Sequence, residues 1–210
     1  MTLRTRLAAG AGAFALAFSL AACGGGDETT PNEPAGTAAE ETTESTSSQT
    51  EVEDVHNDAD TMFAQMMIVH HEGAIEMADL AVERAENPDV RALAERISAA
   101  QGPEIEQMTT WLETWGEETS PMGHEGMDHG GMDMEGMSQE EAMAELESLS
   151  GTEFDRRFLE LMVAHHRGAV DMAQTELDDG ENPQALELAQ KIIDDQQAEI
   201  TEMEGLLQGL

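Results

Sequence analysis

From Asn57 onward, apolar side chains recur every three or four residues, the spacing that places them on one face of an α-helix. Asn87-Pro88 and Asn182-Pro183 interrupt the pattern, each a helix-capping residue followed by a proline suited to the first helical turn. No strand is predicted, because there is no tyrosine and no sustained alternation of β-branched residues. The predicted helices cover about 57–86, 88–116, 153–180 and 183–207.

The second half of this pattern repeats the first. Residues 66–78 read MMIVHHEGAIEMA, and 95 positions later residues 161–173 read LMVAHHRGAVDMA. At the same displacement Gln101 matches Gln196, Glu104 matches Glu199 and Met108 matches Met203. This internal duplication organises the chain into repeat 1 (57–116), a crossover (117–151) and repeat 2 (152–210).

Each repeat predicts an antiparallel helical hairpin, because the connection between its two helices is short. Pro103 lies inside the second helix, where a kink is expected. In the crossover, Ser138 and Glu141 form a capping-box pattern that predicts a short helix over about 139–148. The expected fold is all-α: a ferritin-like four-helix bundle made of two duplicated helical hairpins, with a long crossover that contains a short helix.

The first 56 residues predict export and attachment rather than a folded domain. Residues 1–22 have the basic start and short apolar run of a signal peptide, and Leu20-Ala21-Ala22-Cys23-Gly24 resembles a lipoprotein cleavage box. That resemblance implies lipid on Cys23 and an anchor at the outer face of the cytoplasmic membrane or in the periplasm or cell envelope. Residues 23–56 are rich in Ser, Thr, Gly, Pro and Glu and predict a disordered tether.

The net charge and the cysteine content limit the possible partners and metal ligands. The formal net charge is −36, from 45 acidic and nine basic residues, which argues against nucleic acid and anionic membrane surfaces as partners. Two interpretations of the acidic residues remain: their summed electric field attracts cations, or they form a heavily solvated, salt-adapted surface. Cys23 is the only cysteine, so disulfides and thiolate metal sites are excluded.

Four of the seven histidines stand in two adjacent pairs inside the repeated helices: His70 with His71, and His165 with His166. On a helical wheel His70 points to the middle of the apolar face and His71 to its flank. We predict a metal site between the repeats. Its further candidate ligands are Met67, Met77, Met108, Met162, Met172 and Met203, with Gln101, Glu104, Gln196 and Glu199 nearby. Met77, two turns from His70, would need a second ion or a partner helix, and buried methionines equally fit plain core packing.

Imidazole and thioether ligands without thiolate favour Cu(I), for which Ag(I) is a mimic. A ferritin-like di-iron site needs Glu-x-x-His motifs, but Met67 and Met162 occupy the glutamate positions.

The crossover carries a second candidate site, because residues 122–137 read MGHEGMDHGGMDMEGM. Without apolar periodicity, these methionines are not expected in a core, and glycine would let several thioethers surround one soft ion. A linker whose methionines absorb oxidants is the alternative. The candidate ligands are Met122, His124, Met127, His129, Met132, Met134 and Met137.

The doubled His-His helix, the Asn-Pro turn and the Gln-x-x-Glu-Ile-x-x-Met helix resemble a bacterial domain-of-unknown-function family, the one that includes the periplasmic copper-binding protein CopM. The resemblance covers about residues 57–210 and implies a ferritin-like bundle, export, and binding of copper or silver in metal resistance. Its implied partners are metal ions, the membrane through lipidated Cys23, and copper-exporting or copper-accepting proteins.

The expected function is copper buffering, sequestration or delivery rather than catalysis. Two alternatives stay open: a ferritin-like metal-dependent redox enzyme, and a metal-free helical interaction module with buried, hydrogen-bonded histidines.

Overall fold

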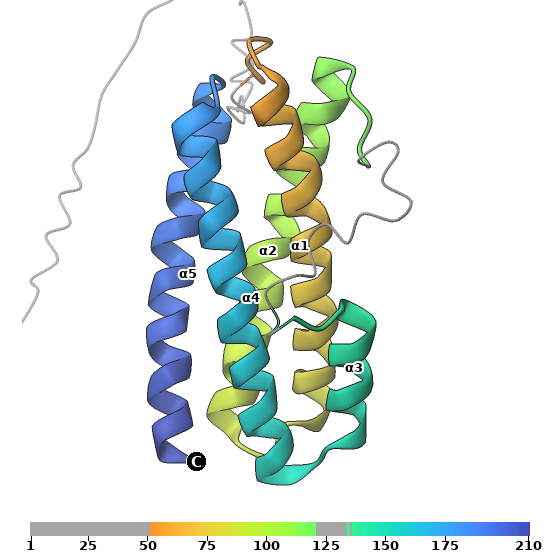
Figure 1. The fold of residues 1–210 in the computed structure, drawn as a ribbon, viewed down its shortest axis with the longest axis vertical. Coiled ribbons are helices and arrows are strands. Elements are labelled where there is room, and N and C mark those ends of the chain that lie inside the picture. The colour runs from red at the N-terminus through yellow and green to blue at the C-terminus, as the bar shows by residue number, and fades with distance from the viewer. Residues whose placement is uncertain (1–50, 121–133, 135) are drawn as a thin grey trace, which may run out of the picture. The chain divides into compact units, whose positions relative to one another are not determined.

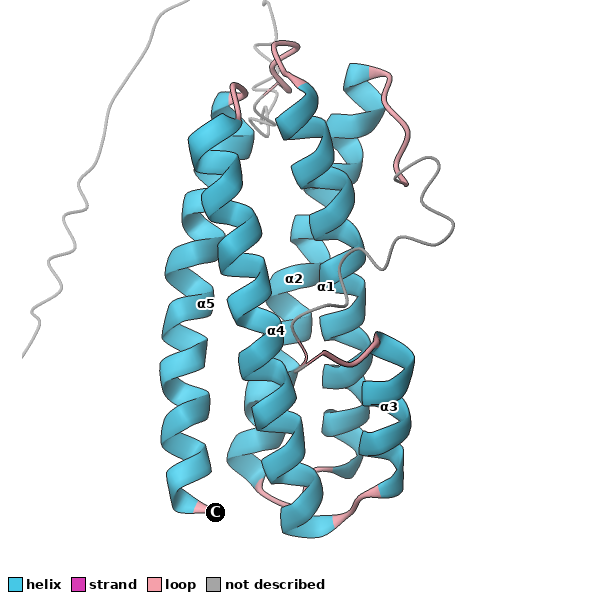
Figure 2. Ribbon diagram, in the orientation of Figure 1, coloured by secondary structure: helices cyan, strands magenta, loops and turns pink. Residues whose placement is uncertain are grey.

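The computed structural model describes residues 51–120, 134 and 136–210. This part of the chain is helical, with loops between the helices and an isolated bridge between Met134 and Met137 (Figure 2). Its five helices are α1 (Asp58–Arg84), α2 (Pro88–Trp115), α3 (Gln139–Ser148), α4 (Gly151–Asp179) and α5 (Pro183–Gly209). None of the described helices is both long enough and apolar enough to cross a membrane.

The helix ends lie where the capping residues predict them. The side chains of Asn87 and Asn182 accept hydrogen bonds from the backbone at the starts of α2 and α5, each followed by proline. Ser138 and Glu141 form the expected capping box of α3. α2 continues through Pro103 and ends at Gly116, whose φ of 75° suits a residue without a side chain.

The four long helices form two hairpins that meet through their first helices (Figure 1). α1 packs against α2, α4 packs against α5, and α1 packs against α4. The short α3 lies against α4 and α1, with the Gln139 amide donating to the Gly73 carbonyl over 3.0 Å. The expected all-α bundle of two hairpins joined by a long connection is confirmed.

The apolar interior is divided into two clusters. One, around Phe63, Met108 and Ala173, joins the first half of α1 to the second half of α4. The other, around Met77, Leu93 and Phe158, joins the second half of α1 to the first half of α4 and includes α3. α1 and α4 therefore run antiparallel, and each long helix passes through both clusters.

Two crossover methionines correct an expectation from the sequence. Met134 is 1% exposed within the second cluster, and Met137 packs against it. The prediction that crossover methionines stay out of the core is wrong for these two residues. Met134 is buried and Met137 half-buried because the segment just before α3 packs on the bundle, where Arg157 of α4 donates to the Met137 sulfur. Local periodicity does not reveal this contact.

Residues 51–56, which the composition places in the tether, lie along the bundle. The Glu53 carbonyl accepts a hydrogen bond from the Trp115 indole over 2.9 Å, and the His56 ring stacks on Trp115 with centroids 4.5 Å apart. Asn182 donates to the Val55 carbonyl over 2.8 Å. This short segment therefore joins the end of α2 to the start of α5.

Two buried aspartates, equivalent in the duplication, each bind the turn of the opposite hairpin. Asp155 on α4 accepts hydrogen bonds from the backbone N–H groups of Glu86 and Asn87, at 3.0 and 2.8 Å. Asp60 on α1 accepts from the backbone of Asn182 at 2.8 Å. Each carboxylate satisfies backbone donors that a helix start leaves free, so the pair holds the two hairpins in register.

Asp60 also lies beside a carboxyl that has no equivalent in repeat 1. Burial, together with hydrogen bonding to Asp60 and the charge of Asp60, raises the pKa of Glu176 to about 8. Burial acts to raise the pKa of Asp60 as well, but hydrogen bonds from Glu176 and the backbone lower it overall. Asp60 is therefore the charged member of the pair and Glu176 the protonated one at neutral pH.

We expect Asp155→Ala to lower the free energy of unfolding by about 1–3 kcal/mol, because two backbone donors lose their acceptor. Urea denaturation at pH 7 measures the change, with the exposed Asp171→Ala as the matched control. Equal stability of the two variants would contradict a role for Asp155 in joining the hairpins.

Candidate metal centre

A polar layer separates the two apolar clusters at the middle of the bundle. Every long helix contributes buried polar side chains there, between its residues in one cluster and its residues in the other. The members are His70 and His71 from α1, Gln101 and Glu104 from α2, His165 and His166 from α4, and Gln196 with the half-buried Glu199 from α5. We call these eight residues the histidine layer.

His70 and His165 meet at the centre of the histidine layer. Their ring centroids are 3.6 Å apart, with an angle of 46° between the planes. Burial, together with the nearby His71 and His166, lowers the pKa of His70 to about 3. Burial and His70 likewise hold the pKa of His165 well below its usual value. Both rings are therefore neutral at physiological pH, as a metal ligand must be.

The outer histidines each donate to a glutamate within their own hairpin. His71 Nε2 lies 2.8 Å from Glu104 Oε2, and His166 Nε2 lies 2.6 Å from Glu199 Oε2. Because an ionised carboxylate only accepts, each ring carries a proton on Nε2, and Nδ1 is the atom that could ligate a metal. A carboxylate that fixes an imidazole in this way is the usual support of a metal-binding histidine.

The first of these glutamates is also bound from the other hairpin. Lys191 on α5 donates to Glu104 Oε1 over 2.8 Å. Burial acts to raise the pKa of Glu104, but the hydrogen bonds from His71 and Lys191 outweigh it and lower the pKa. Glu104 is therefore a carboxylate at neutral pH.

The histidine layer leaves several buried acceptors unused. The Nδ1 atoms of all four histidines have no hydrogen-bond partner among the described residues, and neither has Oε1 of Gln101 or Gln196. Each such group costs about 1–3 kcal/mol unless a ligand or water satisfies it. The layer therefore presents nitrogen and oxygen donors suited to a cation.

Methionines flank the histidine layer on both sides. Met67 and Met108 are fully buried in the cluster on one side, and Met162 and Met203 are fully buried in the cluster on the other. Two further predicted ligands lie elsewhere: Met77 is buried two turns from His70, and Met172 is half-buried near the end of α4. The structure thus gathers the four histidines, with four methionines one turn away, and separates Met77 and Met172 from them.

A solvent-accessible cavity of about 430 Å³ leads to the central pair. Its lining includes both rings, His70 and His165, together with Glu72, Glu76 and Gln139 at the edge of α3. Two acidic side chains at the mouth attract cations, and the imidazoles stand at the inner wall. The layer is therefore buried but reachable.

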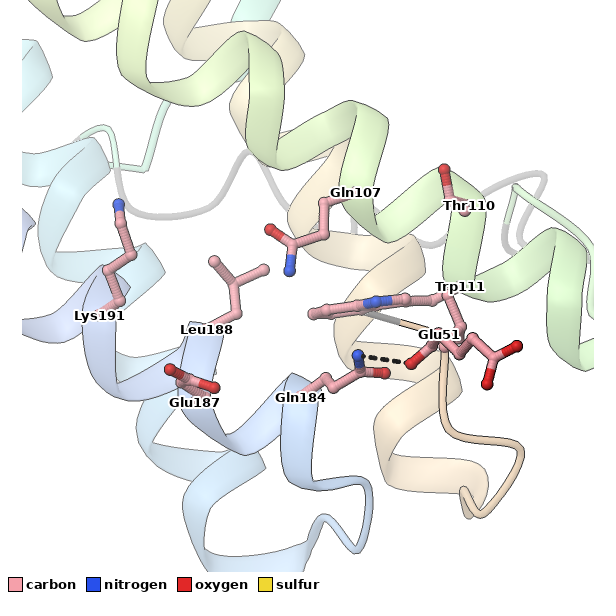
Figure 3. Close-up of a pocket in the computed structure, with 9 residues that line it drawn as sticks. Glu51, Gln107, Thr110, Trp111, Gln184, Glu187, Leu188 and Lys191 are labelled. Carbon is pink, nitrogen blue, oxygen red and sulfur yellow. Dashed lines mark hydrogen bonds between the residues drawn. The ribbon is translucent and has the colours of Figure 1, made fainter. Parts of the chain in front are cut away.

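Another cavity, of about 720 Å³, lies away from the histidine layer (Figure 3). It lies between α2 and α5, beside Trp111, Leu188 and Lys191, and the Gln184 amide crosses it to the Glu51 carbonyl over 3.1 Å. No histidine or methionine lines it. The residues that line it therefore provide no imidazole or thioether ligand for a soft cation.

Within the described residues, no three His, Cys, Asp or Glu side chains are arranged to hold one metal ion. A many-coordinate hard-ion site is therefore not preformed there. The remaining donors are imidazole nitrogens and neighbouring thioethers. This set suits a soft monovalent cation, which needs few ligands.

The other predicted ligands fall outside the described residues or in the core. Met122, His124, Met127, His129, Met132 and Cys23 lie outside the described residues. Met134 and Met137 belong to the second apolar cluster or pack against it.

The sequence interpretation missed three functional or structural residues. Asp60 and Asp155 were overlooked, although they match at the displacement of 95 residues and could have been found by extending the repeat. Glu104 and Glu199 were noted only as neighbours that could equally be solvated. Glu176 gave no signal, because Ala81 takes its position in repeat 1.

These features define a class: helical bundles built from a duplicated hairpin, with paired histidines at the contact between the repeats. Residues 60–207 match the family model described as a domain of unknown function, DUF305, and the chain belongs to this family.

Solved structures of the family share the fold. A DUF305 fragment from Deinococcus radiodurans is 35% identical, with a TM-score of 0.65 over 73% of this chain and 98% of the other. A Streptomyces coelicolor DUF305 protein described as secreted is 32% identical, with a TM-score of 0.64 over 72% and 91%. CopM in a Cu(I)-bound form is 33% identical, with a TM-score of 0.59 over 71% and 96%, and it was also solved bound to Cu(II) and Ag. No curated protein matches the chain.

The neutral central pair predicts a stability loss in acid for the metal-free protein. In the unfolded chain these histidines take up protons near pH 6.5. The folded rings resist protonation down to far lower pH, so the unfolded state binds more protons. We expect the free energy of unfolding to fall as pH drops from about 6.5 towards 4, by up to ~1.4 kcal/mol per pH unit for each histidine.

Urea denaturation at pH 5 and pH 7 measures this slope. The double variant His70→Leu, His165→Leu should flatten it, whereas His56→Gln, outside the layer, should retain it. An unchanged slope in the double variant would show that the acid sensitivity arises elsewhere.

Proposed function

We propose that this protein is an extracytoplasmic, lipid-anchored copper-binding protein that buffers, sequesters or delivers Cu(I), with Ag(I) as a mimic. The histidine layer is the ordered site. The ion is cargo: it enters past Glu72 and Glu76 and is held by neutral imidazole nitrogens, with the buried methionines one turn away as further soft ligands.

One observation carries this proposal: four buried Nδ1 atoms have no hydrogen-bond partner within the described part of the chain, while carboxylates bind Nε2 of two of the rings. A metal-free core would be expected to satisfy such atoms or replace the histidines by apolar residues. A cation uses the lone pairs without requiring a proton.

Two related proteins support the proposed function. CopM has the same helical fold at 30–34% identity and was solved with Cu(I), Cu(II) and Ag. The Streptomyces relative described as secreted agrees with export. Lipid on Cys23 would hold the bundle at the cell surface or in the envelope, where copper-exporting or copper-accepting proteins could exchange ions with it. The segment 122–137 would act as a weaker, exchangeable capture site.

Replacing all four histidines of the layer by alanine should remove the tightest Cu(I) or Ag(I) site. Titration of the mature chain against a competing Cu(I) chelator should show the affinity of that site falling at least about 100-fold. Unchanged isotherms would refute the assignment.

Two controls keep this result interpretable. The double variant His70→Leu, His165→Leu keeps an apolar interior and both histidine–glutamate pairs, so it should fold while still losing affinity. His56→Ala removes a histidine outside the layer and should bind as the wild type does. A chain lacking 122–137 separates ions of the crossover from those of the bundle by native mass spectrometry.

The glutamates offer a milder test. Glu104→Gln with Glu199→Gln keeps the shape of both side chains but removes the charge that fixes each imidazole. We expect Cu(I) or Ag(I) affinity to fall about 10–100-fold. Glu106→Gln, an exposed neighbour on α2, should change nothing. If the paired variant binds as tightly as the wild type, the outer histidines are structural rather than ligands.

A further inference from the structure

The duplication creates two equivalent grooves between α1 and α4, one on each side of the histidine layer, and only one is covered. α3 covers the groove beside the end of α1. Arg84 donates to the carbonyls of Glu147 and Leu149 at the end of α3, and Arg157 pairs with Glu145 on α3 at 3.0 Å. At the positions equivalent to Arg84 and Arg157, the other groove carries Asp179 and Met62.

That second groove is an open cavity of about 420 Å³ between the start of α1 and the end of α4. Met62, Met66 and Met172 line it, with Glu176 and Asp179. Met62 is 62% exposed, the most exposed large apolar side chain of the described bundle. An apolar side chain that is this exposed to solvent does not pack in the apolar core.

The side chains come together by helical spacing. Met62 and Met66 are four residues apart on α1, and Met172 and Glu176 are four residues apart on α4, so each pair shares one face of its helix. By the rise per residue, Met62 and Met172 lie about 10–12 Å along their helices from His70 and His165, and Glu176 lies about 16 Å away, whereas Met66 is one turn from His70. An ion held by Met62, Met172 and Glu176 therefore lies apart from the central histidine pair.

A carboxyl closes the inner wall of this cavity. Glu176 is 1% exposed, and neither of its carboxyl oxygens accepts a hydrogen bond from a described residue. In the metal-free protein Glu176 holds its proton at neutral pH, because an ionised carboxylate would be costly in this buried position beside Asp60. A bound cation would offset that cost.

The donor atoms that line this cavity determine which cation it can bind. Asp58, Glu176 and Asp179 line the cavity, but no three His, Cys, Asp or Glu side chains of the described residues are placed to hold one ion. Calcium and magnesium need several converging oxygen ligands and zinc favours cysteine and histidine, so these ions do not fit. Three thioethers with one carboxylate suit a soft monovalent ion. We propose that Met62, Met66, Met172 and Glu176 form a second Cu(I) or Ag(I) site, separate from the histidine layer and more exposed to solvent.

The other repeat shows that this set is particular to one end of the molecule. The residues equivalent to Met62, Met66, Met172 and Glu176 are Arg157, Leu161, Met77 and Ala81. Met77 and Ala81 are fully buried there, in the cluster that includes α3. The open end has thioethers and a carboxyl where the covered end has core residues and a cation that holds α3.

Native mass spectrometry of the mature chain titrated with Ag(I) tests the proposal. The triple variant Met62→Leu, Met66→Leu, Met172→Leu keeps the apolar volume and should bind one Ag(I) fewer than the wild type. Met143→Leu, a partly buried methionine of α3, is the matched control and should lose none. A triple variant with the full number of ions overturns the inference.

Labelled methionine methyl groups give a second readout that does not depend on counting ions. In the wild type, the resonances of Met62, Met66 and Met172 should shift together at one equivalent step of the Ag(I) titration. Glu176→Gln should weaken that step at least about 10-fold, because it removes the charged ligand. Resonances that stay fixed throughout the titration also overturn the inference.

The same titration in the chain with all four layer histidines replaced separates this site from the proposed function. Retention of the methionine shifts there supports an independent site, even if the histidine layer binds nothing. Loss of the shifts in that folded chain would show that the two regions are one site and would refute the separation.

Discussion

The contact between the His70 and His165 rings is the constraint around which the bundle is built. Duplication brings equivalent residues face to face where the two repeats meet, so one residue type must pack against itself. Two charged imidazolium rings could not occupy this position, and burial keeps both neutral. The outer histidines, by contrast, are bound to glutamates within each hairpin, and the Nδ1 atoms of all four rings have no hydrogen-bond partner among the described residues. The apolar clusters on either side provide the folding energy that offsets this polar layer.

The duplicated halves have diverged at their ends more than at their centre. The two aspartates that bind the opposite turns remain equivalent, and so do the histidine pairs and their glutamates. The grooves beside them differ, because arginines hold α3 over one, while methionines and Glu176 line the other. The two halves thus share a symmetric frame with one end covered by α3 and one open end, where Met62 is largely exposed to solvent.

The acidic side chains act on cations both at long range and in direct contact with the site. The net charge of −36 surrounds the bundle with a field that concentrates cations near it. At close range the acidic side chains are specific: Glu72 and Glu76 stand at the entrance to the central pair, whereas Glu104 and Glu199 orient imidazoles. A protein with this arrangement can gather cations without selectivity at its surface and select soft ones inside, where thioether and imidazole replace carboxylate.

Sequence periodicity, capping residues and the repeat determined the four long helices, α3, the hairpins and the residues that meet at the centre, because these depend on contacts within a few turns. The tertiary structure decided what each side chain does. It placed Met134 in the core, turned His71 from the flank of a helix towards Glu104, and set Asp60 and Asp155 on turns of the opposite hairpin. It also left Glu176 beside an open cavity rather than under α3. Such roles depend on which distant surfaces come together, and helical spacing records only the face on which a residue lies.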